Sequence, residues 1–423
     1  MNLIEELQWR GLIHDIMPGT AEQLMKEVTT GYVGFDPTAD SLHIGSLVPI
    51  VLLVHFQRSG HKPLALIGGA TGMVGDPSGK SEERNLLDEE TLAKNVAGIK
   101  AQLSKFLNFD SSNPAAAELV NNYDWFKGIG FIDFLRDTGK HITVNYMMAK
   151  ESVKKRLDTG ISYTEFAYQL MQGYDFYWLY QNKNCKLQFG GSDQWGNMTT
   201  GTELIRRKAG GEAFVFTNPL VTKADGGKFG KTESGNVWLD PQKTTPFQFY
   251  QFWLNAADAD AQKWIRIFTF LSKEEIDNLI AEHGQDASKR LLQKRLAEEL
   301  TVFVHSRSAY EEAIETTQKV FAQASAPAES LSLQDLEGMN GLEKLDFPVA
   351  TLQAGIDVVS FLAETTIFPS KGEARKTVQG GGVSINRNKV ADVSFPVTSD
   401  LLLHGQYLLV QKGKKNHYLV KAI

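Results

Sequence analysis

The first 220 residues of the chain alternate between short strand-like runs and longer helix-like segments. Three apolar runs, at 63–69, 185–191 and 213–221, have the pattern of buried strands. Helical patterns occur near 44–58, 89–107, 164–182 and 194–208. Strands that alternate with helices predict a mainly parallel α/β sheet, and ligands bind at the carboxyl ends of the strands in such sheets.

The remaining residues predict additional domains. The pattern is helical from about 245 to 322, where Ser272 and Glu275 form a capping-box signature. Residues 323–350 are rich in alanine, serine, proline and glycine, and we interpret them as a linker with some local structure. A small α+β pattern follows to the C-terminus. We therefore divide the chain into the segments 1–222, 223–322, 323–350 and 351–423.

The composition excludes several classes of protein. With 42% hydrophobic and 22% charged residues, it is that of an ordinary globular protein. No apolar run is long enough to cross a bilayer, and the start, MNLIEELQWRG, lacks the basic region and apolar core of a signal peptide. The single cysteine, Cys185, excludes an internal disulfide and a cysteine-based zinc site, and it fits the reducing cytoplasm.

Charge is distributed unevenly along the chain. The net charge is −6, but residues 351–423 carry nine Lys or Arg and five Asp or Glu, which leaves −10 on the first 350 residues. A basic tail on an acidic body indicates contact with a polyanion. A solvated basic face is the alternative that composition alone leaves open.

A histidine and a glycine mark the start of the first helical stretch. His43 and Gly45 follow the apolar run 32–35. Pro37 fixes the turn by which the chain leaves that run. A helix N-terminus favours anions, and Gly45 lets a base or phosphate approach the backbone closely. We interpret the segment as a nucleotide cradle, in which His43 donates to a phosphate oxygen. Taken alone, the pattern fits a simple helix entry better than a nucleotide cradle.

Two glycine-rich loops carry spaced cations. The loop at 68–84 contains Lys80 and Arg84, and its spacing is not that of a Walker P-loop. The loop at 223–235 contains Lys223, Lys228 and Lys231. Mobile cationic loops can close over a phosphate chain in a transition state. A plain surface loop is the alternative for each segment by itself.

Polar residues align on an otherwise apolar helix. Tyr168, Gln172 and Asp175 are spaced i, i+4 and i+7, so they share one helix face. Buried polar groups need partners, which a core network or a polar, aromatic-sized ligand would supply. The segment 190–197, GGSDQWGN, follows a strand, and its Asp193 side chain can accept hydrogen bonds from ribose hydroxyls.

In this order and spacing, the five segments resemble those of tyrosyl-tRNA synthetases, a family of class I aminoacyl-tRNA synthetases. The resemblance covers essentially the whole chain and rests on GFDPTADSLHIG, GGATGMVGDPSGK, TEFAYQLMQGYDF, GGSDQWGN and KADGGKFGKT. Residues 369–390 resemble the S-four-type RNA-binding module of bacterial members. The resemblance implies a Rossmann-like catalytic domain at 1–222, a signature loop and helical domain at 223–322, and an RNA-binding domain at 351–423.

The family's functional residues transfer to matching positions. HIGS at 43–46 falls on the HIGH signature, and KFGKT at 228–232 falls on the KMSKS signature. The resemblance implies catalytic roles for His43, Ser46, Lys80, Arg84, Lys228, Lys231 and Thr232. It implies that tyrosine is bound by Tyr32, Asp76, Tyr168, Gln172, Asp175 and Gln194. It implies that ATP is bound by Asp36, Thr38, His43, Gly45, Gly191, Asp193 and Lys231.

The basic tail and one tyrosine complete the set. We expect tRNA phosphates to contact Arg375, Lys376, Lys412, Lys414 and Lys415. Tyr163 lies in a segment that resembles the family's dimer contact. One position departs from the pattern, because Ser46 stands where HIGH-type members have a second histidine. A serine can donate a hydrogen bond but cannot carry a positive charge.

The resemblance implies a cytoplasmic homodimer that activates L-tyrosine with ATP and transfers it to the tyrosine tRNA. Mg²⁺ is expected to enter with ATP, with no metal held by the protein and no membrane partner. Two alternatives remain open. A tryptophanyl-type relative is disfavoured by the Tyr32 and Asp175 pair. A non-catalytic RNA-binding paralogue is favoured by Ser46 alone.

Overall fold

The computed structural model spans 423 residues and divides into two compact units. Unit 1 contains residues 1–240 and 256–296, and unit 2 contains residues 241–255 and 297–423. The structure describes every residue except 77, 79–86, 152, 155–159, 228, 233–234, 319–325, 340–341 and 414–415, and it describes only the backbone of 231 and 232. This division does not test the four segments assigned from the sequence, which stay a prediction.

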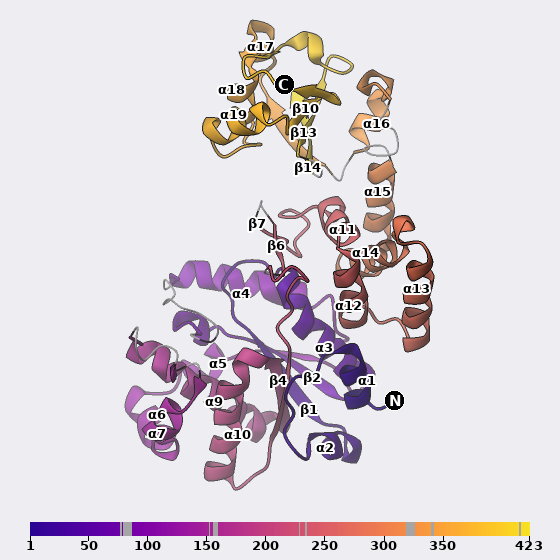
Figure 1. Ribbon diagram of the computed structural model, residues 1–423. Coiled ribbons are helices and arrows are strands. Elements are labelled where there is room, and N and C mark those ends of the chain that lie inside the picture. Colours follow the sequence, from indigo (N-terminus) through magenta and orange to yellow (C-terminus); the bar gives the residue numbers. More distant parts are fainter. Residues whose placement is uncertain are drawn as a thin grey trace. The chain divides into compact units, whose positions relative to one another are not determined.

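A parallel sheet of five strands, ordered β3–β2–β1–β4–β5, forms the centre of unit 1 (Figure 1). The strands are β1 (Thr30–Phe35), β2 (Lys62–Ile67), β3 (Glu118–Asn121), β4 (Cys185–Gly191) and β5 (Phe214–Asn218). Strands β2 and β3 are added on one side of β1, and strands β4 and β5 are added on its other side. The order reverses between β1 and β4, and a ligand crevice is expected at the carboxyl ends of these two strands. The predicted parallel α/β fold is therefore confirmed.

Helices connect the strands and cover the sheet. The helices of unit 1 that connect or flank the strands are α1 (Leu3–Arg10), α2 (Thr20–Lys26), α3 (Leu47–Arg58), α4 (Glu89–Leu103), α5 (Tyr123–Phe126), α6 (Phe131–Asp137), α7 (Val144–Met148), α9 (Tyr163–Lys183) and α10 (Trp195–Ala209). The right-handed crossover rule places α3 and α4 on the face of the sheet opposite α10 (Figure 1). All four predicted helical stretches are present, whereas β3, whose four residues are only half-buried, has no clear sequence pattern.

Helix α3 is apolar on nearly every side, and most of its surface is buried against other elements. Nine of its 12 residues are buried, and it contacts β2 and the later helix α12 (Asp258–Phe268). A short 3₁₀ turn, η1 (Ile44–Ser46), precedes it and places His43 at the entry. The apolar run that follows the histidine thus forms a rigid support for the start of the helix.

Helices α9 and α10 cross closely where two glycines meet. A Cβ on Gly201 would lie 2.8 Å from the Cβ of Phe176, and a Cβ on Gly173 would lie 3.1 Å from a Thr200 methyl carbon. Any larger side chain would push the helices apart. This close crossing fixes α9 and, with it, the polar face that carries Tyr168, Gln172 and Asp175.

Unit 2 combines helices with a second sheet. Its helices are α11 (Pro246–Leu254), α15 (Arg307–Thr317), α16 (Leu333–Glu337), α17 (Val349–Ala354), α18 (Val358–Glu364) and α19 (Lys371–Gln379). Helix α14 (Leu291–Val304) spans the division between the units. Helix α13 (Lys273–Gln285), which belongs to unit 1, begins with the predicted capping box of Ser272 and Glu275. Among the described residues, no helix combines the length and apolarity needed to cross a membrane.

The sheet of unit 2 is ordered β11–β10–β13–β14–β8. Its strands are β8 (Glu343–Phe347), β10 (Val383–Ile385), β11 (Asn388–Val390), β13 (Tyr407–Lys412) and β14 (Asn416–Ala422). β8 pairs in parallel with β14, although it lies in the segment interpreted as a linker. A buried apolar cluster that includes Phe361, Phe368 and Leu408 packs α18 and α19 on this sheet.

Candidate active site

A cavity of about 190 Å³ opens at the carboxyl ends of β1 and β4, at the reversal of strand order. Eight residues predicted to bind tyrosine or ATP line it: Tyr32, Asp36, Asp76, Tyr168, Gln172, Asp175, Gly191 and Gln194. The three polar residues of α9 reach this one cavity, as their helical spacing predicts. The arrangement joins residues from segments up to 162 positions apart in the sequence, Tyr32 to Gln194.

A first group of cavity residues combines a tyrosine hydroxyl with a buried carboxyl. Tyr32 is 1% exposed, and its hydroxyl has no hydrogen-bond partner among the described residues. Asp175 is 2% exposed and accepts hydrogen bonds from Nδ2 of Asn122 at 3.0 Å and Nε1 of Trp125 at 2.9 Å. A buried hydroxyl without a partner is costly, so this group suits a ligand that carries its own hydroxyl.

Burial controls the protonation of both groups. It raises the pKa of the Asp175 carboxyl to about 8, against the hydrogen bonds from Asn122 and Trp125, which lower that pKa. Burial, followed by the charge of Asp175, raises the pKa of Tyr32 well above its ordinary value. The Tyr32 hydroxyl therefore keeps its proton and can donate it to a hydrogen bond.

The raised pKa of Asp175 predicts a pH-dependent stability. An unfolded aspartate has a pKa of about 4, so between about pH 4 and pH 8 the unfolded chain loses a proton that the folded chain retains. The contribution of Asp175 to stability is complete below about pH 4 and declines as the pH rises to about 8. In Asp175→Asn we expect this decline, of about 2–5 kcal/mol, to be absent. Thermal unfolding of both proteins at pH 5 to 8 tests this, and parallel curves would contradict it.

A second group of polar side chains surrounds Asp36, just after β1. The hydroxyl of Tyr168 lies 3.3 Å from both carboxylate oxygens of Asp36, and the hydroxyl of Thr71 lies 3.4 Å from one of them. Nδ2 of Asn122 donates to Oγ1 of Thr71 at 3.1 Å. Asn122 thereby links the Asp36 group to Asp175.

A third group presents one carboxylate and three amides. Nε2 of Gln194 donates to Asp76 at 2.7 Å, and Nδ2 of Asn197 donates to Oε1 of Gln172 at 2.9 Å. Asn197 also lies 3.4 Å from Asp76 and 3.2 Å from the hydroxyl of Ser78. Carboxylate and amide oxygens accept from an ammonium group, and amide N–H groups donate to a carboxylate. This group can therefore bind the two charged ends of an amino acid.

The His43 segment is fixed by its own backbone. Nδ1 of His43 accepts a hydrogen bond from the N–H of Gly45 at 3.0 Å. A Cβ on Gly45 would lie 2.7 Å from Cε1 of the His43 ring, so only glycine lets the ring fold over this turn. Ser46 follows as the cap of α3 and makes no side-chain capping hydrogen bond.

The segment that carries Lys231, which we call the lysine-bearing segment, lies next to His43. It forms a hairpin of β6 (Lys231–Thr232) and β7 (Gly235–Asn236). The backbone N–H of Ile44 donates to the carbonyl of Val237 at 2.9 Å, and the N–H of Leu239 donates to the carbonyl of Leu42 at 2.8 Å. A Cβ on Gly230 would lie 3.2 Å from Ile44. The two segments that resemble the family signatures are thus adjacent in space.

Several predicted residues lie elsewhere or outside the description. The lining of the 190 Å³ cavity does not include Thr38, His43, Gly45, Ser46 or Asp193. Residues predicted to bind phosphate or RNA that fall outside the described part of the chain are Lys80, Arg84, Lys228, Lys414 and Lys415. Arg375 and Lys376 are exposed on α19. Lys412 contacts the Phe368 ring at 4.0 Å and donates to the Ile367 carbonyl at 3.1 Å.

Four cavity or support residues are missing from the sequence prediction. They are Thr71, Asn122, Trp125 and Asn197. Asn197 lies three positions after Gln194, a helical spacing that would have identified it as a neighbour of that side chain. Asn122 and Trp125 lie beyond β3 in a stretch without a clear pattern, and only the fold brings them to Asp175.

Comparisons with known proteins match both parts of the chain. Residues 25–322 match the family model of class I tRNA synthetases (W and Y), and residues 340–420 match that of the tyrosine–tRNA ligase SYY-like C-terminal domain. A tyrosine–tRNA ligase of Bacteroides fragilis is 61% identical over 429 residues, which cover 100% of both chains. One of Porphyromonas gingivalis is 61% identical over 99% of both chains.

A solved structure agrees with these matches. A C-terminally truncated mitochondrial tyrosyl-tRNA synthetase of Aspergillus nidulans superimposes with a TM-score of 0.68 at 30% identity, covering 76% of this chain and 94% of the other. The chain belongs to the class I tRNA synthetases for tryptophan and tyrosine and, within them, to the tyrosine–tRNA ligases. The family resemblance noted from the sequence is confirmed. Nothing in the comparisons supports a non-catalytic paralogue.

Proposed function

We infer that the chain carries out the reaction of its family, the ATP-dependent attachment of L-tyrosine to its tRNA. The observation that carries this inference is the cavity itself. Its lining combines a buried hydroxyl and carboxyl, those of Tyr32 and Asp175, with a carboxylate–amide group around Asp76. A phenol fits the first group, and the ammonium and carboxylate of an amino acid fit the second.

Tyrosine is selected through its hydroxyl. The side chains of Tyr32 and Asp175 each hydrogen-bond the phenol of the substrate. Phenylalanine would leave both buried groups without that partner, and each unpaired group costs about 1–3 kcal/mol. Asp76, Gln172 and Tyr168 hold the ammonium group, and Gln194 lies near the carboxylate. This division of roles is our proposal, supported by the shared cavity.

The first chemical step needs no nucleophile from the protein. An oxygen of the tyrosine carboxylate attacks the α-phosphorus of ATP in line, the bond from that phosphorus to the bridging oxygen breaks, and pyrophosphate leaves. Mg²⁺ enters as part of the ATP substrate and neutralises phosphate charge. The protein supplies position and charge stabilisation. We assign these tasks to His43, Ser46, Lys80, Arg84, Lys228, Lys231 and Thr232.

The second step transfers tyrosine to RNA. A ribose hydroxyl of the 3′-terminal adenosine attacks the tyrosyl carbonyl, and AMP leaves. The nucleotide portion of the adenylate is contacted by Asp36, Thr38, Gly45, Gly191 and Asp193.

The transfer step is measured as labelled tyrosine bound to tyrosine tRNA in the presence of ATP. We expect charging that depends on ATP, and its absence in the folded chain would contradict the proposal.

The exposed basic residues of α19 bind tRNA phosphates in this proposal. Each phosphate contact contributes roughly 0.7–0.9 to the slope of log affinity against log salt. In the double variant Arg375→Ala and Lys376→Ala, we expect weaker tRNA binding and a slope reduced by roughly 1–2. Filter binding across a salt series measures both quantities. As a control, Lys421→Ala removes one charge from β14 of the same unit. An unchanged slope in the double variant would contradict the proposal.

We further propose that two copies of the chain associate through α6, α7 and the start of α9. Phe131, Ile132, Val144 and Tyr163 are each more than 60% exposed there, and α6 buries none of its residues. Exposed apolar side chains that gather on one surface mark a contact site. Sedimentation at twice the chain's mass is the expected result, and a monomer would contradict it. We place the dimer in the cytoplasm, in keeping with its single cysteine.

A further inference from the structure

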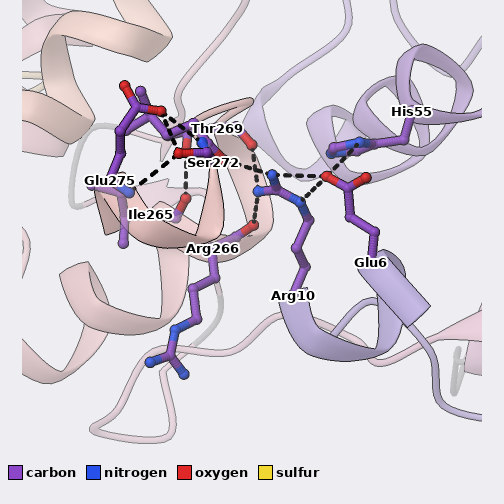
Figure 2. A network of polar contacts seen from close by, with 9 residues as sticks. Glu6, Arg10, His55, Ile265, Arg266, Thr269, Ser272 and Glu275 are labelled. Atoms are coloured by element: carbon purple, nitrogen blue, oxygen red, sulfur yellow. Dashed lines mark hydrogen bonds and ion pairs between the residues drawn. The ribbon is translucent and has the colours of Figure 1, made fainter. Parts of the chain in front are cut away.

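Arg10, the last residue of α1, spans two distant parts of unit 1 (Figure 2). Its Nη1 donates to the carbonyls of Arg266 at 2.9 Å and Thr269 at 2.8 Å, and its Nη2 donates to the carbonyl of Leu271 at 2.7 Å. Its Nε donates to Oε1 of Glu6 at 3.1 Å. These contacts place a cation on the last turn of α12 and on the chain that leaves it.

The position suits the end of a helix. The last carbonyls of an α-helix have no partner within the helix, and the helix dipole favours a cation there. Arg10 is 3% exposed, so its hydrogen bonds are shielded from water. The hydroxyl of Thr269 satisfies a neighbouring carbonyl, that of Ile265. The guanidinium therefore fixes where α12 ends relative to α1.

Glu6 and His55 complete the network. His55 of α3 is buried, and its Nδ1 lies 3.8 Å from Oε1 of Glu6 (Figure 2). Burial, followed by the charges of Arg10 and Arg58, lowers the pKa of His55 to about 3, so its imidazole is neutral at pH 7. Arg10 is thus the charged hydrogen-bond partner of Glu6, and the charge of Arg58 also interacts with Glu6. The three helices α1, α3 and α12 meet at this point.

Helix α12 also supports the lysine-bearing hairpin. The ring of Phe229 stacks on Phe268 with centroids 5.2 Å apart and meets Trp264 edge-on at 5.0 Å. Phe268 and Trp264 are buried on α12. Phe229 is followed by Gly230, which lies against Ile44, and then by β6. The position of α12 is therefore transmitted to the backbone that carries Lys231.

We propose that Arg10 is a positioning residue for tyrosyl-adenylate formation, which acts by fixing the carboxyl end of α12 and, through Phe229, the lysine-bearing hairpin beside His43. The inference rests on the proposed function of that hairpin. Within the part of the chain that the structure describes, the hydrogen bonds of Arg10 go to Glu6, Arg266, Thr269 and Leu271, and the cavity lining includes none of these residues. We therefore expect substitution of Arg10 to change the rate and to leave tyrosine binding intact. Misplacement of a catalytic group by about 1 Å can lower a rate by about 100-fold.

The test compares Arg10→Gln and Arg10→Lys with Leu24→Ala in the full chain. Leu24 is buried on α2, a helix that packs on β5, so its truncation lowers stability without touching α12. For each variant we measure the single-turnover rate of adenylate formation, the tyrosine dissociation constant and the urea midpoint. We expect Arg10→Gln to lower the rate by about 10- to 100-fold, with tyrosine affinity within about twofold. Arg10→Lys should recover part of the rate, because an ammonium can still donate to two or three carbonyls.

Two further measurements separate positioning from general stability. If Arg10 acts through Phe229, the double variant of Arg10→Gln and Phe229→Leu loses little more rate than the worse single variant. Amide exchange at Ile44 and Val237 needs no substrate, and it should become faster in Arg10→Gln but not in Leu24→Ala. Additive rate losses, unchanged amide exchange, or a rate loss matched by Leu24→Ala would overturn the role of Arg10. An inactive wild-type chain would instead overturn the proposed function, while amide exchange would still test the positioning.

Discussion

Replacing Lys231 with alanine is expected to slow tyrosyl-adenylate formation by about 10²- to 10³-fold while changing tyrosine affinity by less than about twofold. Lys231 begins β6, beside the backbone of the His43 segment. In the proposed mechanism its charge acts on the phosphates only as negative charge develops during the attack. A group that acts in the transition state alone lowers the rate and leaves ground-state binding unchanged.

Single-turnover kinetics with labelled ATP, alongside equilibrium dialysis with tyrosine, separate the two effects. Lys263→Ala is the matched control, since it removes the same charge from an exposed position on α12. We expect this control to keep the wild-type rate. A Lys231 variant that loses rate and affinity equally would assign Lys231 to ground-state binding and contradict the proposed role.

Asp175→Ala is expected to weaken tyrosine binding by about 10²- to 10³-fold. The truncation removes a hydrogen-bond partner of the phenol. It also leaves the buried Nε1 of Trp125 without its acceptor and Nδ2 of Asn122 with Thr71 as its remaining acceptor. Phenylalanine has no hydroxyl that could hydrogen-bond Asp175, so its affinity should change far less. The variant therefore loses selectivity between the two amino acids as well as affinity for one of them.

Competition dialysis with tyrosine and phenylalanine measures both affinities. Tyr177→Phe, on the same helix but outside the cavity lining, serves as the control and should bind like the wild type. An equal loss of affinity for both amino acids would show that Asp175 maintains the shape of the cavity rather than recognising the phenol.

Periodicity and strand ends made much of this site predictable. The spacing of Tyr168, Gln172 and Asp175 places them on one face of α9, and the structure brings all three to one cavity. The apolar runs at β2, β4 and β5 predict buried parallel strands, and polar residues that follow such strands gather at one edge of the sheet. The resemblance to tyrosyl-tRNA synthetases then assigned a role to each position.

Contacts created only by the fold were beyond the sequence. Trp125 and Asn122 reach Asp175 because β3 pairs with β2, and β3 has no strong pattern of its own. Arg10 binds backbone carbonyls more than 250 positions later in the chain. Every residue type has a backbone carbonyl, so the sequence does not indicate which carbonyls accept hydrogen bonds from Arg10. Tertiary packing alone determines this contact.

The most direct test of the account is the exchange of labelled pyrophosphate into ATP by the full chain, with Mg²⁺ and a panel of tyrosine, phenylalanine and tryptophan. We expect exchange with tyrosine alone. That result would establish the first half-reaction and show that Ser46 is tolerated at the second-histidine position of the signature. A folded chain that shows no exchange with any of the three amino acids would contradict the account.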